Sequence, residues 1–256
     1  MDASLLNGRM TSFLTPSRNE RSEIGLLVDK SKERLRFLFK EEFEYHHLAV
    51  HRSDAYLRRH SGKKIDMFVL FVDLGRSTIM SSDLTPEDFA RIIRMFSQEM
   101  SYIIENFGGL VLKFVGDAVI GYFPSDGKPS KTATKVACCA YAMNRVICES
   151  VNPLLKGEML PDLQIKISAD FGTNNIVRYG SDRVKSHIDV IGLSVNLAAK
   201  MQTLGNPGIF VIGETVYRQL PPRLQGCFKR ARVDSTKWPY HGIHTTRIYP
   251  IFLTKV

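Results

Sequence analysis

Residues Ile65 to Thr78 read IDMFVLFVDLGRST, and this stretch determines the fold that we predict. Ile65 to Val72 has the length of a strand buried in a sheet, and its part from Met67 to Val72 is purely apolar. Asp73 follows this strand and stands before the loop Gly75-Arg76-Ser77-Thr78. Such a loop can offer backbone N–H groups to an anion. A strand-end aspartate is as often the cap of a turn, so this stretch alone leaves both interpretations open.

The following segments alternate helical and strand patterns in the order β-α-β-β-α-β. A helix is predicted from Thr85 to Asn106, because Pro86 stands in its first turn and Gly108 follows its end. Further helices are expected at about 132–149 and 194–204, and strands at 110–114, 118–123, 163–171, 175–179, 187–191, 208–212, 226–233 and 246–252. This order predicts an α/β fold (an α+β sandwich) with a ferredoxin-like core, helices on one side of the sheet, and a C-terminal extension.

The chain divides at Ser61-Gly62-Lys63-Lys64, a polar joint that contains a glycine. We expect residues 62–256 to form the main domain and residues 1–61 to form an N-terminal arm and helix. The arm lacks periodicity up to about residue 24, and an amphipathic helix with a break near His51 is predicted from Ile24 to Arg59. This helix has two possible roles. It packs on its own domain, or it serves as a dimer contact or a sensor.

Composition excludes several classes of protein. The chain has 256 residues, of which 44% are hydrophobic, enough for a full core. Its apolar runs are much shorter than the roughly 20 residues that span a bilayer, and its start lacks the pattern of a secretory signal, so we expect a cytoplasmic protein without a membrane span. The net charge of +9 suits an anionic partner. Nucleic acid is not expected, because no basic stripe interleaved with aromatic residues is present.

A second carboxylate, Asp117, lies in the predicted hairpin Lys113-Phe114-Val115-Gly116-Asp117-Ala118, where glycine allows a sharp turn. In a ferredoxin-like sheet the first strand and this hairpin lie side by side, so Asp73 and Asp117 are expected to converge. Paired carboxylates without His or Cys suit Mg²⁺ or Mn²⁺. Two such ions can polarise an attacking hydroxyl and neutralise a leaving pyrophosphate. The alternative is that caps and nearby lysines satisfy both acids.

A third motif, DVIGLSVNLAAK, covers Asp189 to Lys200. Asn196 and Lys200 stand one helical turn apart near the start of a helix, so both can reach the same ligand. Asp189 stands before a glycine turn, where its carboxylate can accept a hydrogen bond from an amino group. An Asn/Lys pair at this spacing is common by chance and carries little weight alone.

Together, and in this order, these motifs resemble the catalytic domain of class III adenylate and guanylate cyclases over about residues 63–253. The Phe171-Gly172 segment belongs to the same resemblance. It implies that Asp73 and Asp117 bind two metal ions, Mg²⁺ or Mn²⁺, and that the carbonyl of Leu74 contacts one of them. It also implies that the loop Gly75, Arg76, Ser77, Thr78 holds the β- and γ-phosphates of a nucleoside triphosphate.

The resemblance assigns the remaining groups to a second subunit. Lys113 and Asp189 match the pair that recognises adenine, and Asn196 matches the residue that orients the ribose. In the family these groups face the metals across a dimer interface, so a head-to-tail homodimer with two equivalent sites is implied.

Two departures from the family pattern are visible. Lys200 stands where the family normally has an arginine that stabilises charge on the α-phosphate, and lysine lacks the planar bidentate fork. Thr173 follows Phe171-Gly172 where many members carry arginine, so phosphate binding is expected to depend on Arg76 or on basic residues near the C-terminus such as Lys237.

The leading hypothesis is an adenylate cyclase that converts ATP into 3′,5′-cyclic AMP and pyrophosphate at a homodimer interface. One alternative keeps the fold and reaction but changes the base: a pyrimidine cyclase of an antiphage system, which makes cyclic CMP or cyclic UMP. Another alternative is a degenerate cyclase domain that binds nucleotide and serves as a regulatory dimerisation module. The activating signal and the downstream effector have no signature in the sequence.

Overall fold

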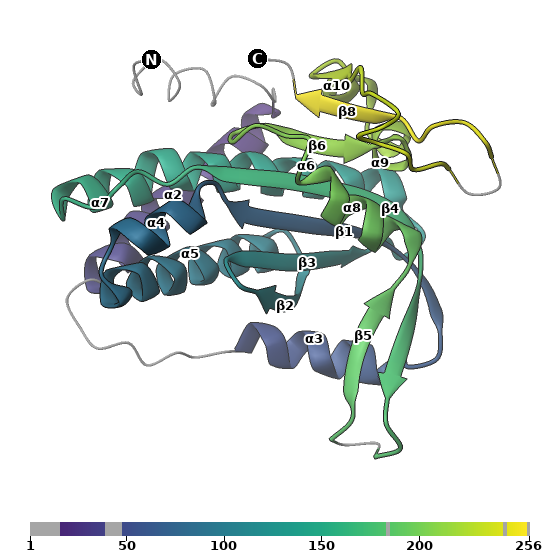
Figure 1. Ribbon diagram of the computed structural model, residues 1–256, viewed down its shortest axis with the longest axis horizontal. Helices are drawn as coiled ribbons and strands as arrows, with labels where there is room; N and C mark the ends of the chain where they lie inside the picture. The colour runs from purple at the N-terminus through teal and green to yellow at the C-terminus, as the bar shows by residue number, and fades with distance from the viewer. Residues whose placement is uncertain (1–15, 39–47, 183–184, 243–244, 255–256) are drawn as a thin grey trace.

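The computed structural model describes residues 16–38, 48–182, 185–242 and 245–254. Within them, an eight-stranded sheet carries helices on both faces (Figure 1). Residues 1–15 of the expected arm lie outside the described residues. No helix in the described ranges is long and apolar enough to cross a membrane.

The centre of the sheet is the predicted ferredoxin-like core. Strand β1 (Lys64–Leu74) pairs antiparallel with β3 (Ala118–Pro124) on one side and with β4 (Ile165–Tyr179) on the other. Strand β2 (Leu110–Val115) pairs with β3 and gives the order β2-β3-β1-β4. The α/β fold class is therefore confirmed, with the first strand beside the hairpin.

Strand β4 differs from the prediction of two strands, at 163–171 and 175–179. The polar residues between them do not interrupt the strand, because the buried side chain of Asn174 finds partners inside the sheet. Its amide donates to the Gly172 carbonyl at 2.9 Å, and its oxygen accepts from Ser194 Oγ at 2.8 Å. A polar stretch whose hydrogen bonds are satisfied can therefore continue a strand.

The C-terminal extension widens the sheet beyond β4. Strand β5 (His187–Ile191) forms a hairpin with the end of β4, and β6 (Phe210–Gly213) pairs parallel to β4. Strand β8 (Ile251–Thr254) joins β6 to β7 (Phe228–Arg230). The strands predicted at 226–233 and 246–252 therefore exist, but both are shorter, and the second begins later in the chain.

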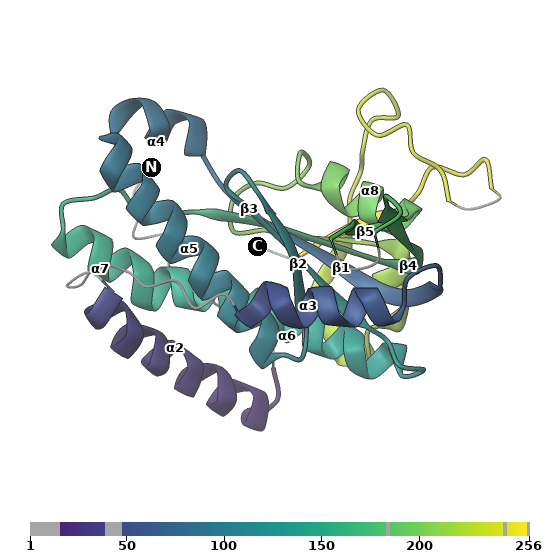
Figure 2. The ribbon, with the colours of Figure 1, turned by 90° about the horizontal axis from the view of Figure 1, so that it is seen from below.

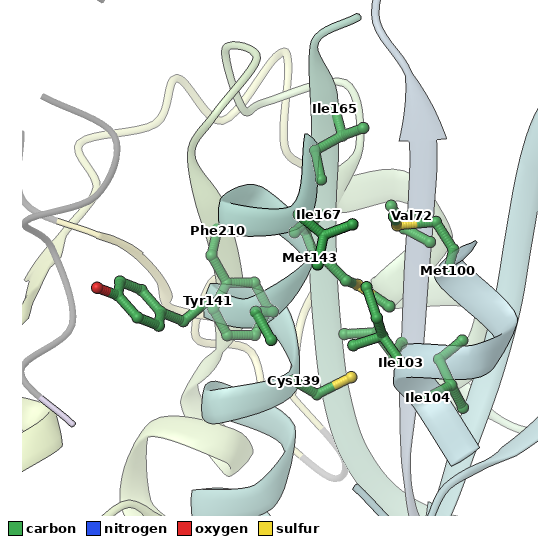
Figure 3. Close-up of a cluster of buried hydrophobic side chains, with 14 of the residues drawn as sticks. Val72, Met100, Ile103, Ile104, Cys139, Tyr141, Met143, Ile165, Ile167 and Phe210 are labelled. Atoms are coloured by element: carbon green, nitrogen blue, oxygen red, sulfur yellow. The ribbon is translucent and has the colours of Figure 1, made fainter. Parts of the chain in front are cut away.

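One face of the sheet is covered by α5 (Pro86–Asn106) and α6 (Pro129–Val146), and α2 (Arg18–Leu38) packs on the outer side of these two helices. Helix α5 begins where predicted, since the Thr85 hydroxyl caps it by accepting the N–H of Asp88. The helix expected at 132–149 is longer, because α6 continues through a π-helical turn (Ile147–Val151) into α7 (Asn152–Gly157). Figure 3 shows the resulting core, in which methionine and isoleucine side chains of the helices meet β1 and β4.

The other face carries α3 (Leu48–Arg59) and α8 (Leu193–Met201), so the expectation of helices on one side was incomplete. Alternation along β1 explains both layers: Phe68 and Leu70 face the α5/α6 core, whereas Met67 and Val69 lie in a second cluster with Leu57 of α3. Figure 2 shows α3 running alongside the sheet.

The N-terminal helix predicted from 24 to 59 is two helices, α2 and α3. The segment between them, 39–47, lies outside the described residues, and α3 runs through His51 without the predicted break. Three short helices complete the fold: α4 (Ser77–Asp83), α9 (Glu214–Gln219) and α10 (Pro222–Gln225).

Candidate active site

Asp73 and Asp117 come together at one end of the central strands. Asp73 is the penultimate residue of β1, and its register partner on β3 is Ala118, the residue after Asp117. The tight β2–β3 turn depends on Gly116, whose φ is 60°. The convergence expected from the sequence is therefore present.

The electrostatics of this end show how close the two acids are. Burial, the negative charge of Asp117 and a hydrogen bond with Asp117 raise the pKa of Asp73 to about 6, while Lys166 and the Leu74 backbone act in the opposite direction. Two carboxyl groups that disfavour each other's charge form a natural seat for a cation with oxygen ligands.

This donor set fits Mg²⁺ or Mn²⁺. In the described part of the chain, no group of three or more His, Cys, Asp or Glu residues is placed to hold a metal. Mg²⁺ commonly takes only one or two protein carboxylates and completes its shell with water and substrate phosphates. Asp73 and Asp117 thus fit an ion that binds together with a phosphorylated substrate.

Lys166 is a residue that the sequence analysis missed. It lies on β4 directly across from Asp73 and is half-buried, so it brings a positive charge to the carboxylate pair. Thr173, considered from the sequence as a lost phosphate contact, instead pairs with Asp66 at the opposite end of β1, where its hydroxyl donates to the Asp66 carboxylate at 2.5 Å. The neighbours of Lys166 and Thr173 follow from the register between β1 and β4, which motif spacing in the sequence does not reveal.

The loop after Asp73 is shorter than expected. Gly75 is buried, and a Cβ there would lie 3.1 Å from the Gln164 carbonyl oxygen and 3.2 Å from Pro207, so a side chain at this position would require these neighbours to shift. Arg76 adopts a left-handed conformation with φ of 66° and gives α4 no side-chain cap. Ser77 and Thr78 therefore belong to the first turn of α4.

Lys113 and Asp189 form an ion pair within the same chain. Nζ of Lys113 lies 2.5 Å from Oδ2 of Asp189, and the Asp189 side chain is only 18% exposed. A register shift in β2 between Val111 and Lys113 accompanies this contact. The two residues come from β2 and β5, so the sheet brings together what the sequence separates.

Asn196 and Lys200 lie on the exposed side of α8, while Leu197 and Ala198 of the same helix are buried. Gly192 is required before this helix, because a Cβ there would overlap the Asn174 side-chain oxygen at 2.0 Å. Among the described residues, no hydrogen bond or ion pair joins the side chains of Asn196 or Lys200 to the aspartates or to the Lys113–Asp189 pair. One chain thus presents three groups of candidate site residues.

Exposed apolar side chains adjoin all three groups. Val115 precedes the hairpin turn and is 54% exposed, and Ile79 follows Thr78 and is 53% exposed. Ile191 and Leu193, between Asp189 and Asn196, are 42% and 37% exposed. Large apolar side chains gathered around polar ones are typical of surfaces that contact another molecule.

Several known proteins resemble this chain in sequence. A uridylate cyclase from Rhodovulum sp. (strain MB263) is 32% identical over 148 residues, which are 55% of this chain and 59% of that protein. A cytidylate cyclase from Escherichia coli is 25% identical over 153 residues, which are 57% of this chain and 34% of that protein. The chain therefore spans less than two thirds of the length of these relatives.

Among solved structures, the guanylyl cyclase Cya2 superimposes with a TM-score of 0.64 at 20% identity, covering 76% of this chain and 93% of that chain. This likeness shows the fold. The family profile described as adenylate and guanylate cyclase catalytic domain matches residues 60–248, a range that contains all three groups of side chains. The chain therefore belongs to the family of class III nucleotide cyclase catalytic domains.

Proposed function

We propose that the protein converts a pyrimidine nucleoside triphosphate, UTP before CTP, into its 3′,5′-cyclic monophosphate and pyrophosphate. The observation that carries this choice is the similarity to relatives named uridylate cyclase and cytidylate cyclase, of which the Rhodovulum protein is 32% identical. ATP, favoured from the sequence, has no such support among these relatives. The fold is neutral on the base, because the structural neighbour Cya2 is a guanylyl cyclase.

The Lys113–Asp189 pair is compatible with this choice. Lysine is a donor only and an ionised aspartate is an acceptor only. Adenine satisfies such a pair with its N6 amino group and a ring nitrogen. Uracil satisfies it equally with a carbonyl oxygen and its N3–H, and cytosine with its N4 amino group and N3. The pair therefore selects a base whose edge carries a hydrogen-bond donor next to an acceptor. Such an edge is not unique to adenine.

In the proposed reaction, Asp73, Asp117 and the Leu74 carbonyl hold two divalent ions. When bound, these ions supply polarisation of the 3′-hydroxyl and neutralisation of the pyrophosphate. Lys166 and Arg76 add positive charge beside the triphosphate, and the first-turn N–H groups of α4 are available to its oxygens. Charge neutralisation and positioning then account for most of the catalysis.

Asn196 and Lys200 act on the substrate from the partner subunit of a homodimer. Asn196 orients the ribose, and Lys200 stabilises the charge that develops on the α-phosphate. Within the described part of one chain, no hydrogen bond or ion pair joins these side chains to Asp73, and this supports the arrangement, as do the exposed apolar residues around them. A nucleotide-binding module without catalysis is disfavoured because both aspartates are present and converge.

The test is to incubate the purified protein with UTP, CTP, ATP or GTP and Mn²⁺ or Mg²⁺, and to identify products by mass spectrometry. We expect cyclic UMP, cyclic CMP or both. Cyclic AMP as the main product would overturn the pyrimidine assignment, and no cyclic product from any substrate would overturn catalysis. Asp73→Asn should abolish turnover, whereas the matched control Asp66→Asn, at the exposed far end of the same strand, should keep it.

A further inference from the structure

A second cleft lies away from the catalytic groups, between α3, the outer ends of β2 and β3, and the start of α6. Its volume is about 620 Å³, within the range of small-molecule sites. Five basic side chains line it: Arg52, Arg59, Lys128, Lys131 and Lys135. The proposed reaction uses none of them.

The positive charge of this cleft is poorly balanced. Asp126 is the only carboxylate in its lining, and Arg52 approaches Glu105 at no closer than 3.5 Å. Lys128, Lys131 and Lys135 form no ion pair with any other residue that the structure describes. Lys131 and Lys135 stand one helical turn apart on α6, where like charges repel. A cleft lined by one sign of charge focuses the electric field and raises the local concentration of counter-ions, here anions.

The start of α6 adds to the same field. This helix of 18 residues begins beside the cleft, and Lys128 at its N-cap gives no side-chain hydrogen bond. The positive end of the helix dipole therefore reinforces the lysines. Gly108 borders the cleft next to Lys135. A Cβ at position 108 would lie 3.3 Å from Nζ of Lys135.

The cleft also has an apolar part, formed by Leu110, Phe123 and the ring of Tyr56. Tyr56 is fixed from behind by Tyr122 and His60, whose ring centroids lie 6.0 Å and 4.3 Å away. A concave site with cations and an aromatic side chain suits a compact ligand that carries several phosphates on an organic body.

We propose that this cleft binds a small organic polyphosphate, such as a nucleoside polyphosphate, as an effector distinct from the substrate. The ligand would join α3, through Arg52 and Arg59, to the β2–β3 hairpin and α6. The same hairpin carries Asp117 at its other end, so a ligand that clamps α3 onto it also steadies the metal-binding end.

The experiment is calorimetric titration of the full chain with inorganic tripolyphosphate in EDTA, which keeps the metal-dependent site inactive, at about 150 mM salt. We expect one tripolyphosphate per chain. Lys131→Glu/Lys135→Glu should weaken binding by at least about tenfold, because two charge-assisted contacts become repulsive. The control Lys156→Glu/Lys229→Glu changes the net charge equally at exposed positions outside the cleft and should alter affinity by less than about twofold.

Several results would overturn the proposal: no binding by the wild type, equal weakening in both double variants, or loss of binding in Arg76→Gln/Lys166→Gln, which would assign the ligand to the catalytic site. Retention by vesicles containing a phosphoinositide, without binding of free tripolyphosphate, would assign the cleft to a lipid surface. If the charge-reversal variant unfolds by circular dichroism, Lys128→Gln/Lys131→Gln is expected to show the same loss with less strain. Because binding is measured without turnover, failure here is independent of the proposed cyclase activity.

Discussion

Asp170 is a buried carboxyl group that the proposed reaction does not use. It is 1% exposed, and its Oδ1 accepts hydrogen bonds from the hydroxyls of Thr215 at 2.6 Å and Tyr249 at 2.8 Å. Burial raises the pKa of Asp170 to about 7, although these hydroxyls and the Phe171 backbone favour the ionised form. Asp170 therefore holds a proton near neutral pH that it would lose in the unfolded chain.

This raised pKa makes stability depend on pH. Because the folded state binds the extra proton, the contribution is intact below about pH 4 and is lost as the pH rises toward about 7. Asp170→Asn keeps an oxygen that accepts both hydroxyls and cannot ionise. We predict that it is more stable than the wild type at pH 8, by up to about 4 kcal/mol, and similar at pH 4. Urea unfolding at both pH values measures this; an unchanged pH dependence in the variant would contradict it.

Lys200 differs from the arginine that the cyclase family normally carries at this position. Lysine offers a point charge, whereas arginine offers two parallel donors to a phosphate. We predict that Lys200→Arg raises kcat by about tenfold with little change in KM, and that Lys200→Ala lowers kcat by about 100-fold. Lys156→Arg, an exposed exchange elsewhere, is the control. Wild-type kcat in Lys200→Ala would remove this residue from the mechanism.

At the scale of elements, α2 is attached to the catalytic core by a buried ion pair. Nη2 of Arg34 lies 2.7 Å from Oε2 of Glu99 on α5, whose side chain is fully buried, and the guanidinium stacks 3.7 Å from the centre of the Tyr102 ring. Removing one partner of such a pair leaves an uncompensated buried charge. Although the sequence suggested a boundary at residue 61, α2 and the main domain are in direct contact.

We therefore predict that Arg34→Met lowers the free energy of unfolding by about 3 kcal/mol, and that adding Glu99→Gln recovers much of this loss. Lys32→Met, which removes the exposed pair with Asp29 on the same helix, should cost less than about 0.5 kcal/mol. Urea denaturation at pH 7 gives all three values. Equal costs for Arg34→Met and Lys32→Met would mean that α2 folds independently of the core.

Elements that depend on local pattern were predictable, and those that depend on distant partners were not. Helix α5 was predicted closely because Thr85, Pro86 and Gly108 mark its ends within the sequence itself. Strand β4 was divided in the prediction because Asn174 looks like a loop residue until Ser194, on α8, satisfies it. The same distinction separates Asp73, found by its motif, from Lys166, which only the β1–β4 register brings beside it.

At the scale of the whole molecule, the metal-binding end of β1 and α8 share one face of the sheet, because Asp73 lies on the same side of β1 as Val69 and Phe71, and Phe71 packs against α8. Asp73 and Asp117 sit where β1 ends, whereas Asn196 and Lys200 lie on the exposed side of α8 and form no hydrogen bond or ion pair with either aspartate among the described residues. Exposed Val115 and Leu193 adjoin one group each, so both surfaces are suited to burial against a second molecule. A head-to-tail dimer satisfies both surfaces at once and forms two identical sites.

This arrangement predicts complementation between two inactive variants. Asp73→Asn lacks metal binding and Asn196→Ala lacks the ribose contact, so each homodimer should be inactive. In a heterodimer, one site combines the intact aspartates of one subunit with the intact Asn196 of the other, while the second site carries both lesions. Random mixing after co-expression makes about half of the dimers mixed, so total activity should return to about one quarter of wild type. A mixture of Asp73→Asn with Asp117→Asn, whose lesions fall on the same surface, should stay inactive. Activity in that mixture would mean that the two aspartates act from different subunits, and no activity in the first mixture would place the whole site within one chain.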